Sequence, residues 1–171
     1  MKQILFSLFL YTSLFAYFEN IDSFEADFNQ TVSDDNNKVL SYKGSVVASK
    51  PQNVLWTYVS PVKKNVYINS NSITIIEPEL EQVIIKRIES NFNFFNMIKN
   101  AKKIEENVFV AHYKESKFTI TTEKNLIKSI SYLDEFENNV KIVFQNQKQN
   151  EQVNSELFIP VIPEEFDVIE D

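Results

Sequence analysis

The sequence predicts a mainly β fold, an antiparallel meander with few helices, and three observations carry that prediction. Apolar and polar residues alternate with a period of two along most of the chain, as in half-buried strands. Short turns rich in Asn, Asp and Ser separate the alternating stretches. One stretch repeats its apolar residues at steps of three and four, as in a helix. Strands joined in order by short turns favour antiparallel pairing.

The first sixteen residues, "MKQILFSLFLYTSLFA", are typical of a secretory signal peptide. A basic residue, Lys2, precedes an apolar run that ends at the small residue Ala16, and this run is too short for a membrane-spanning helix of about 20 residues. We expect residues 1–16 to be removed and residues 17–171 to form a single domain. An uncleaved N-terminal helix remains the alternative, since Leu14 fits a cleavage site poorly.

The alternating stretches follow one another along the whole chain. They cover residues 40–48, 54–58, 66–68 and 73–75 in the first half, and residues 109–113, 118–120, 126–132 and 140–144 in the second. Residues 18–28 are ambiguous, because they alternate at their end but could begin with a turn of helix. The Asn- and Gln-rich residues 145–152 are expected to form a loop.

One amphipathic helix is expected over residues 91–103, with Ser90 as its N-cap. Its apolar residues are Phe94, Phe95, Ile98, Ala101 and Ile104. We expect the first three of these to face the sheet and the three lysines, Lys99, Lys102 and Lys103, to face solvent.

Composition excludes several classes of function. The formal net charge is −7 and no long basic stripe is present, so nucleic acid is not an expected partner. The chain has no Cys and one His, His112, which excludes a thiol nucleophile, a lipid-anchored Cys and a multi-histidine metal site. The single Gly, Gly44, cannot form a glycine-rich phosphate loop. We therefore expect an exported monomer that is not an enzyme and needs neither a metal nor a cofactor.

Large apolar side chains are abundant for a chain with one sheet and little helix. Of the 15 Phe and 7 Tyr, 12 and 6 lie after Ala16. They form either a tight core beneath the helix or the lining of a ligand cavity, and both interpretations stay open at this point. Carboxylate pairs such as Glu77 and Glu79 leave an acid–base hydrolase as a remote alternative.

Four stretches occur in a characteristic order and spacing: "SFEADFNQTV", "YKGSVVASKPQNVLWTYVSP", "EPELEQV" and "FIPVIPEEFDVIED". Together they resemble the LolA family, the periplasmic carriers of outer-membrane lipoproteins, over residues 23–168. The resemblance implies a curved antiparallel sheet that forms an incomplete barrel, with one or a few helices acting as a lid over a hydrophobic cavity. It also implies a periplasmic chaperone that takes acylated lipoproteins from an inner-membrane releasing transporter to an outer-membrane receptor.

The resemblance also implies where the binding site lies. The expected lipid-binding residues come from the Trp-bearing strand and from the predicted helix: Val54, Trp56, Tyr58, Phe92, Phe94, Phe95, Met97 and Ile98. Lys50 stands where the family usually has an Arg that bonds lid carbonyls, so it is the expected lid latch, although Lys lacks the planar donor fork. Cleavage after Ala16 would truncate the family's first capping helix. An exported binder of another lipid, such as a glycolipid or polyprenyl chain, remains an alternative.

Overall fold

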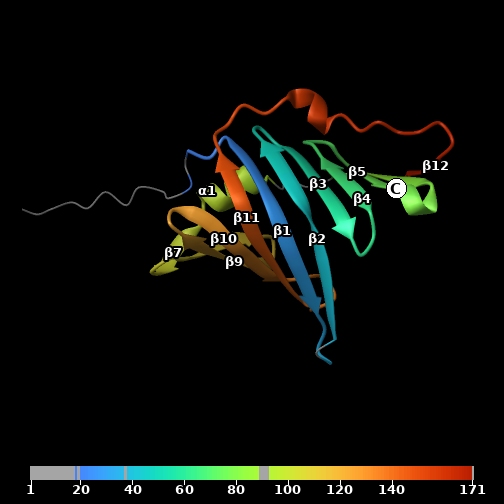
Figure 1. Ribbon diagram of the computed structural model, residues 1–171. Helices are drawn as coiled ribbons and strands as arrows, with labels where there is room; N and C mark the ends of the chain where they lie inside the picture. The colour runs from blue at the N-terminus through green and yellow to red at the C-terminus, as the bar shows by residue number, and fades with distance from the viewer. Residues whose placement is uncertain (1–17, 19, 37, 89–92, 171) are drawn as a thin grey trace, which may run out of the picture.

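The computed structural model describes residues 18, 20–36, 38–88 and 93–170, and the chain forms one open, curved sheet of twelve strands (Figure 1). The strand order is β12-β6-β5-β4-β3-β2-β1-β11-β10-β9-β8-β7. The predicted signal peptide, residues 1–16, lies outside the described residues. Within the described part of the chain, no helix is long and apolar enough to cross a membrane.

The strands agree closely with the alternating stretches of the sequence. Before the helix they are β1 (Ser23–Ser33), β2 (Val39–Ser49), β3 (Asn53–Ser60), β4 (Lys64–Ile68), β5 (Ser72–Glu77) and β6 (Gln82–Arg87). After it come β7 (Lys102–Glu105), β8 (Val108–Tyr113), β9 (Ser116–Glu123), β10 (Leu126–Leu133), β11 (Asn139–Gln149) and β12 (Asp167–Glu170). Two 3-10 turns, η1 (Pro78–Leu80) and η2 (Ser155–Phe158), complete the fold.

The predicted antiparallel meander is confirmed, with one parallel strand pair at its edge. Strands β1 to β6 pair in chain order as antiparallel neighbours, and so do strands β7 to β11. The pairing of β1 with β11 joins these two sets into a single sheet. The last strand, β12, pairs in parallel with β6. In the ambiguous stretch 18–28, strand β1 begins at Ser23. We call the described residues before it, 18 and 20–22, the lead segment.

The loop expected over residues 145–152 is wrong for residues 145–149, because β11 continues to Gln149. This extension pairs with the beginning of β1, where Phe24 lies opposite Gln149. The backbone amides and carbonyls of β1 need these partners, and Asn and Gln side chains are tolerated there because several of them are exposed.

The helix, α1 (Phe94–Lys99), is shorter than residues 91–103. Asn93 is its N-cap, whereas Ser90 and Phe92 lie outside the described residues. Lys102 and Lys103 were expected on the outer face of the helix but lie in β7, paired with β8. The four residues of β7 are all exposed and offer no apolar face to bury, so edge pairing satisfies their backbone better than another helical turn.

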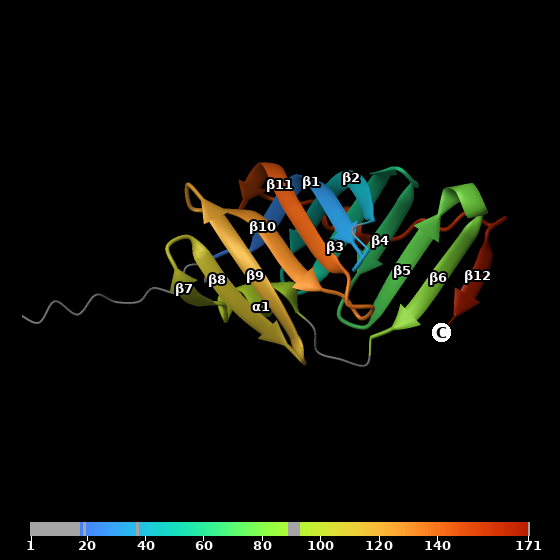
Figure 2. The same ribbon diagram turned by 90° about the horizontal axis from the view of Figure 1, so that it is seen from below.

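The main hydrophobic core lies between α1 and the concave face of the sheet, which Figure 2 shows from below. Phe95, Met97 and Ile98 of α1 are buried in it. The lead segment contributes Phe18, whose ring contacts Phe109 of β8 at 5.0 Å between centroids. The helix and the lead segment therefore cover the half of the concave face that includes β8.

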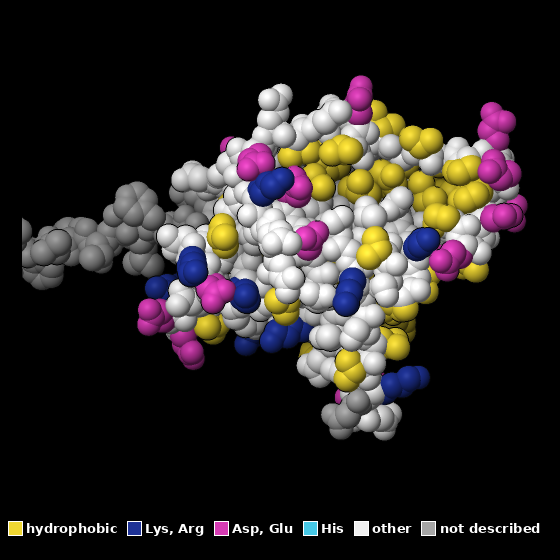
Figure 3. Space-filling view, viewed as in Figure 1, with side chains coloured by type: hydrophobic (Ala, Val, Ile, Leu, Met, Phe, Trp, Pro, Cys, Tyr) yellow, Lys and Arg dark blue, Asp and Glu magenta, His cyan; other side chains and the backbone are white. Residues whose placement is uncertain are grey.

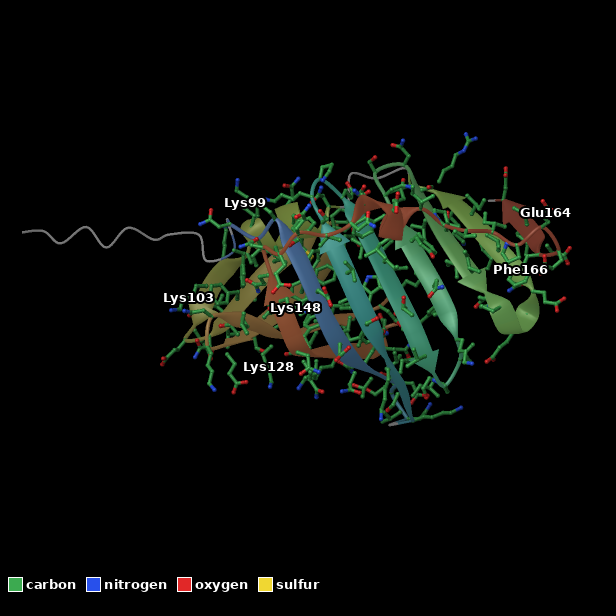
Figure 4. The ribbon with its side chains drawn as sticks, turned by 45° about the horizontal axis from the view of Figure 1, so that its top comes forward. Lys99, Lys103, Lys128, Lys148, Glu164 and Phe166 are labelled. Carbon is green, nitrogen blue, oxygen red and sulfur yellow. The ribbon has the colours of Figure 1, made fainter. Side chains whose placement is uncertain are left out.

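The C-terminal segment crosses the other face of the sheet (Figure 1). It leaves β11, contacts β3 through η2, and ends at β12, where the Asp167 amide donates to the Glu81 carbonyl at 2.9 Å. Phe166 lies at the end of this crossing beside β6 and β12 (Figure 4). On this other face, Ile76 and Val83 are buried although neither belongs to the main core.

Candidate functional site

An apolar cavity of about 150 Å³ lies between the concave face and α1. Four strands of the first half, three of the second half and the helix contribute to its wall: Phe24, Val46, Ala48, Gln52, Val54, Trp56, Ile68, Phe94, Met97, Phe118, Ile130, Tyr132, Ile142 and Phe144. Gln52 contributes an amide and Tyr132 a hydroxyl to this otherwise largely apolar wall. A cavity of this size and lining has room for an apolar group about as large as benzene.

Aromatic side chains form the centre of the wall. Trp56 lies edge-on to Phe28, with ring centroids 4.9 Å apart, and Tyr58 lies edge-on to the other side of Phe28 at 5.1 Å. Trp56 also approaches Phe144 from β11 at 6.4 Å. Such edge-to-face pairs favour defined ring positions over a disordered apolar surface. The prediction that Trp56 faces the concave side is confirmed.

Gly44 makes this packing sterically feasible. A Cβ atom at Gly44 would lie 1.9 Å from the Thr57 carbonyl oxygen and 2.9 Å from the Phe28 ring. The pairing of β2 with β3 also shifts between Lys43 and Gly44, which brings the two backbones close together. The one glycine of the chain is therefore required by the contact that supports Phe28.

Asn93 fastens α1 to the turn between β2 and β3. Its Oδ1 accepts from the Asn96 amide at 3.0 Å, which caps the helix, while its Nδ2 donates to the Pro51 carbonyl at 2.7 Å. The same Nδ2 lies 3.4 Å from Oε1 of Gln52, on the cavity wall. One side chain thus both begins the helix and holds it against the sheet.

Lys50, the expected lid latch, lies on the same turn but reaches the lead segment of the chain. Its Nζ pairs with Asp22 Oδ1 at 2.5 Å, and its amide donates to the Asp22 carbonyl at 2.9 Å. Both side chains are well exposed, so the ion pair adds little stability by itself. Its role as a latch stays a prediction.

The other predicted site residues divide into four groups. Val54, Trp56, Phe94 and Met97 line the cavity. Tyr58 lies beside Phe28, on the concave face next to the cavity. Phe95 and Ile98 are buried at 3% and 0% exposure in the core rather than on the wall, and Phe92 lies outside the described residues. Whether these side chains bind lipid stays a prediction.

The wall that faces Trp56 was not among the predicted site residues. Phe118, Ile130, Tyr132, Ile142 and Phe144 come from β9, β10 and β11. Their alternation was visible, but it does not tell which face of each strand is concave. That depends on the pairing of β1 with β11, between residues more than 100 positions apart. Asn93 was not predicted as the N-cap because Ser90, three residues earlier, also fits that role by residue type.

The concave face continues beyond the cavity as a row of apolar side chains, which we call the trough. Side chains of β4, β5 and β6 extend the row that begins with Ile68: Val66, Ile73, Ile75 and Ile84. All four are partly exposed, unlike the buried core beneath α1. The trough therefore offers further apolar surface next to the cavity.

The stretch "EPELEQ" shapes a turn at the edge of this trough. Pro78 begins η1, Glu81 adopts a left-handed conformation with φ of 50°, and Gln82 donates to Glu77 Oε2 at 2.5 Å. The pattern thus joins β5 to β6 and does not reach the cavity.

The family model and the related sequences that match this chain point to the same protein family. The family model described as "Outer membrane lipoprotein carrier protein LolA" matches residues 19–160. The chain is 39% identical to an outer-membrane lipoprotein carrier protein of Campylobacter jejuni over 99% of both chains. It is 32% identical to the protein of the same name from Wolinella succinogenes, over 90% of both chains.

Solved structures with the same fold are more distant in sequence. A LolA superfamily protein of Nitrosomonas europaea superimposes with a TM-score of 0.53 at 10% identity, covering 82% of this chain and 91% of that chain. An uncharacterized conserved protein of Thermus thermophilus gives a TM-score of 0.55 at 10% identity, with coverage of 91% and 94%. At this identity the likeness concerns the fold alone.

Proposed function

Because the chain belongs to the LolA family of outer membrane lipoprotein carrier proteins, we propose that it carries lipoproteins through the periplasm, with their acyl chains in the cavity beneath α1. The observation that supports this best is the cavity itself. Aromatic and aliphatic side chains form most of its lining, and it lies under a short helix that Asn93 bonds to the turn between β2 and β3. Most folds fill such a space with core side chains.

The cavity in this structure is too small for an acyl chain. At about 150 Å³ it suits a benzene-sized group, whereas an acyl chain of about 14 carbons needs several times that volume. Loading therefore requires α1 to move away from the sheet, or the chain to run on into the trough. On this proposal the structure is the closed form.

The helix is suited to such a movement. It has six residues, too few to be stable as a helix on its own, so it depends on Asn93 and on its apolar contacts. Phe94 and Met97 belong both to the helix and to the cavity wall and would move with it. Met side chains adapt easily to ligands of irregular shape.

Partial exposure of the trough also fits a carrier. Complete burial of a chain of about 14 carbons contributes on the order of 10 kcal/mol, at about 0.8 kcal/mol per methylene. Cargo held that tightly would not be passed on at a useful rate. Acyl groups that extend over partly exposed Ile75 and Ile84 would bind less tightly and remain within reach of a receptor.

The proposal extends to location and partners. The signal-peptide pattern of residues 1–16 supports export to the periplasm. An inner-membrane releasing transporter would load the cavity and an outer-membrane receptor would empty it. The energy for loading would come from the transporter, since no glycine-rich phosphate loop is present in the sequence.

Mass spectrometry of the protein purified from the periplasm under mild conditions tests the proposal. We expect acylated proteins to copurify with it. A glycolipid or polyprenyl lipid in their place would support the alternative cargo, and an empty protein that also fails to accept a lipopeptide would contradict both.

Val54→Glu supplies the matched variant, because Val54 lines the cavity. We expect loss of the copurifying cargo with a nearly unchanged melting temperature, since a carboxylate in a cavity that opens can reach water. Collapse of the melting temperature would instead favour a closed core at this position, where an unpaired charge costs several kcal/mol.

A further inference from the structure

A band of polar side chains crosses the concave face next to the apolar cavity. We call it the tyrosine belt, and its members are Gln30 of β1, Tyr42 of β2, Tyr58 of β3, Lys64 of β4 and Tyr132 of β10. The register aligns them, since Gln30 pairs with Tyr42, and Tyr58 pairs with Lys64. Tyr132 also lines the cavity, so the belt and the cavity are continuous.

The contacts within the belt aim hydrogen-bond donors at the concave side. The Tyr58 hydroxyl donates to Gln30 Oε1 at 3.0 Å, which leaves the Gln30 amino group as a donor. Lys64 Nζ lies 4.7 Å from the centroid of the Tyr58 ring, and the Tyr42 ring lies 6.0 Å from that ring. No carboxylate belongs to the belt, although Asp134 lies close enough to Tyr132 to act on it electrostatically.

The two more buried phenols stay protonated over the physiological range. Burial, with smaller contributions from Tyr132 and Tyr42, raises the pKa of Tyr58 to about 12. Burial also raises the pKa of Tyr132, and Asp134 adds to the effect. Both hydroxyls therefore keep their protons: that of Tyr58 is donated to Gln30, and that of Tyr132 can be donated to a ligand.

The position of the belt matches the linkage region of an acylated molecule. Tyr58 follows Trp56 by two residues on the same face of β3, so it lies one side-chain row beyond the apolar wall. A molecule with its hydrocarbon tails under α1 would place the groups that join tails to head at this row. In bacterial lipoproteins these groups are ester and amide carbonyls, whose oxygens accept hydrogen bonds.

We propose that the tyrosine belt binds the ester and amide carbonyl groups that link acyl chains to the N-terminal cysteine of a lipoprotein. This inference rests on the proposed function and deepens it, because it assigns an orientation to the cargo. The tails point toward α1 and the attached protein lies outside the open end of the cavity. The belt also makes the site selective, since a plain hydrocarbon gains nothing from its donors.

Two synthetic lipopeptides test this inference: one carries ester-linked acyl chains, and the other carries ether-linked chains of equal length that lack the ester carbonyls. We expect the parent protein to bind the ester form more tightly by roughly threefold to tenfold for each belt donor that participates. The double variant Tyr58→Phe, Tyr132→Phe should bind both forms equally, because it lacks the Tyr132 donor and the contact that orients the Gln30 amino group. Its rings remain, so packing against Phe28 is kept.

Tyr67→Phe is the matched control, because Tyr67 lies on β4 between Val66 and Ile68 and its side chain points to the opposite face of the sheet. It should keep the preference for the ester form. Uptake of an apolar dye should be the same in all three proteins and verifies that the cavity is intact.

The outcomes separate this inference from the proposed function. A parent protein without preference for the ester form, or a double variant that keeps the preference, would overturn the role of the belt while leaving the carrier function in place. A parent protein that takes up the dye but binds neither lipopeptide would overturn both.

Discussion

The strands near the two ends of the sheet bury apolar residues on opposite faces. In the half that contains β8 and β9, Ile120 is completely buried on the concave side beneath α1, together with Ile98 of the helix. In the half formed by β4, β5 and β6, Val83 is completely buried on the other side, which the C-terminal segment crosses. Ile75 and Ile84, which lie on the concave face of the same strands, remain partly exposed.

This difference shows how one sheet can be stable and still keep an apolar surface free. Strands β5 and β6 carry apolar residues on both faces, so one face can form a core while the other is left for a ligand. The C-terminal segment crosses the face on which Val83 is buried. Its apolar residues Leu157, Ile159 and Val161 are exposed, and hydrophobic side chains gather on this side of the molecule (Figure 3).

The largest effect on stability is expected in the half covered by α1. Ile120→Ala should lower the free energy of unfolding by about 2 to 5 kcal/mol, because it removes completely buried methyl and methylene groups and leaves a cavity. Urea unfolding measures this. Ile75→Ala in the trough is the matched comparison and should cost less than about 1 kcal/mol while weakening lipopeptide binding. Equal losses of stability would remove the distinction between the halves.

Val83→Ala tests the core on the other face. We expect a loss of about 2 kcal/mol in the free energy of unfolding, since two buried carbon groups are deleted. Dye uptake and lipopeptide affinity should not change, because Val83 faces away from the trough. A parallel loss of binding would mean that the two faces are coupled.

Asn93→Ala tests how α1 is held against the sheet. Removal of the N-cap and of the bond to the Pro51 carbonyl should cost about 1 kcal/mol of stability. It should also speed release of bound lipopeptide, measured by stopped-flow fluorescence, because α1 opens more readily. Asn96→Ala, at an exposed position of the same helix, should leave the release rate unchanged. Equal rates for the two variants would argue against movement of α1.

The smallest effect is expected at Lys50. Its exposed pair with Asp22 contributes at most about 1 kcal/mol, so stability should change little. If Lys50 acts as a latch, Lys50→Arg should slow lipoprotein transfer and Lys50→Leu should speed it, each by roughly a factor of two to five. Three indistinguishable transfer rates would show that Lys50 is no latch.

Much of the sheet could be predicted because strand alternation is a local property. The stretches around Val46, Trp56 and Ile142 were all found, and so was the aromatic start of α1. The end of the helix was misplaced because the lysines of β7 fit a helix surface as well as an edge strand. Its true state is decided by a partner strand, β8, that a local pattern does not specify.

The cavity wall formed by β3 and α1 was predicted, but the facing wall from β9, β10 and β11 was not, because it depends on contacts between distant parts of the chain. Val54 and Trp56 were identified together because they share a strand, whereas Phe144 meets Trp56 through the long-range pairing of β1 with β11. The partner of Lys50 was also out of reach, because Asp22 lies 28 positions earlier in the sequence. Contacts between distant segments depend on the whole topology rather than on the residues nearby.

Quenching of Trp56 fluorescence by a lipopeptide with brominated acyl chains tests most directly whether the concave cavity holds the cargo. The chain has a single Trp, and it lies on the cavity wall, so its emission reports on that site alone. We predict saturable quenching by the brominated lipopeptide and none by the unbrominated form. Tight binding of the brominated lipopeptide, shown independently by anisotropy, without loss of Trp56 emission would place the acyl chains elsewhere and contradict the proposed site.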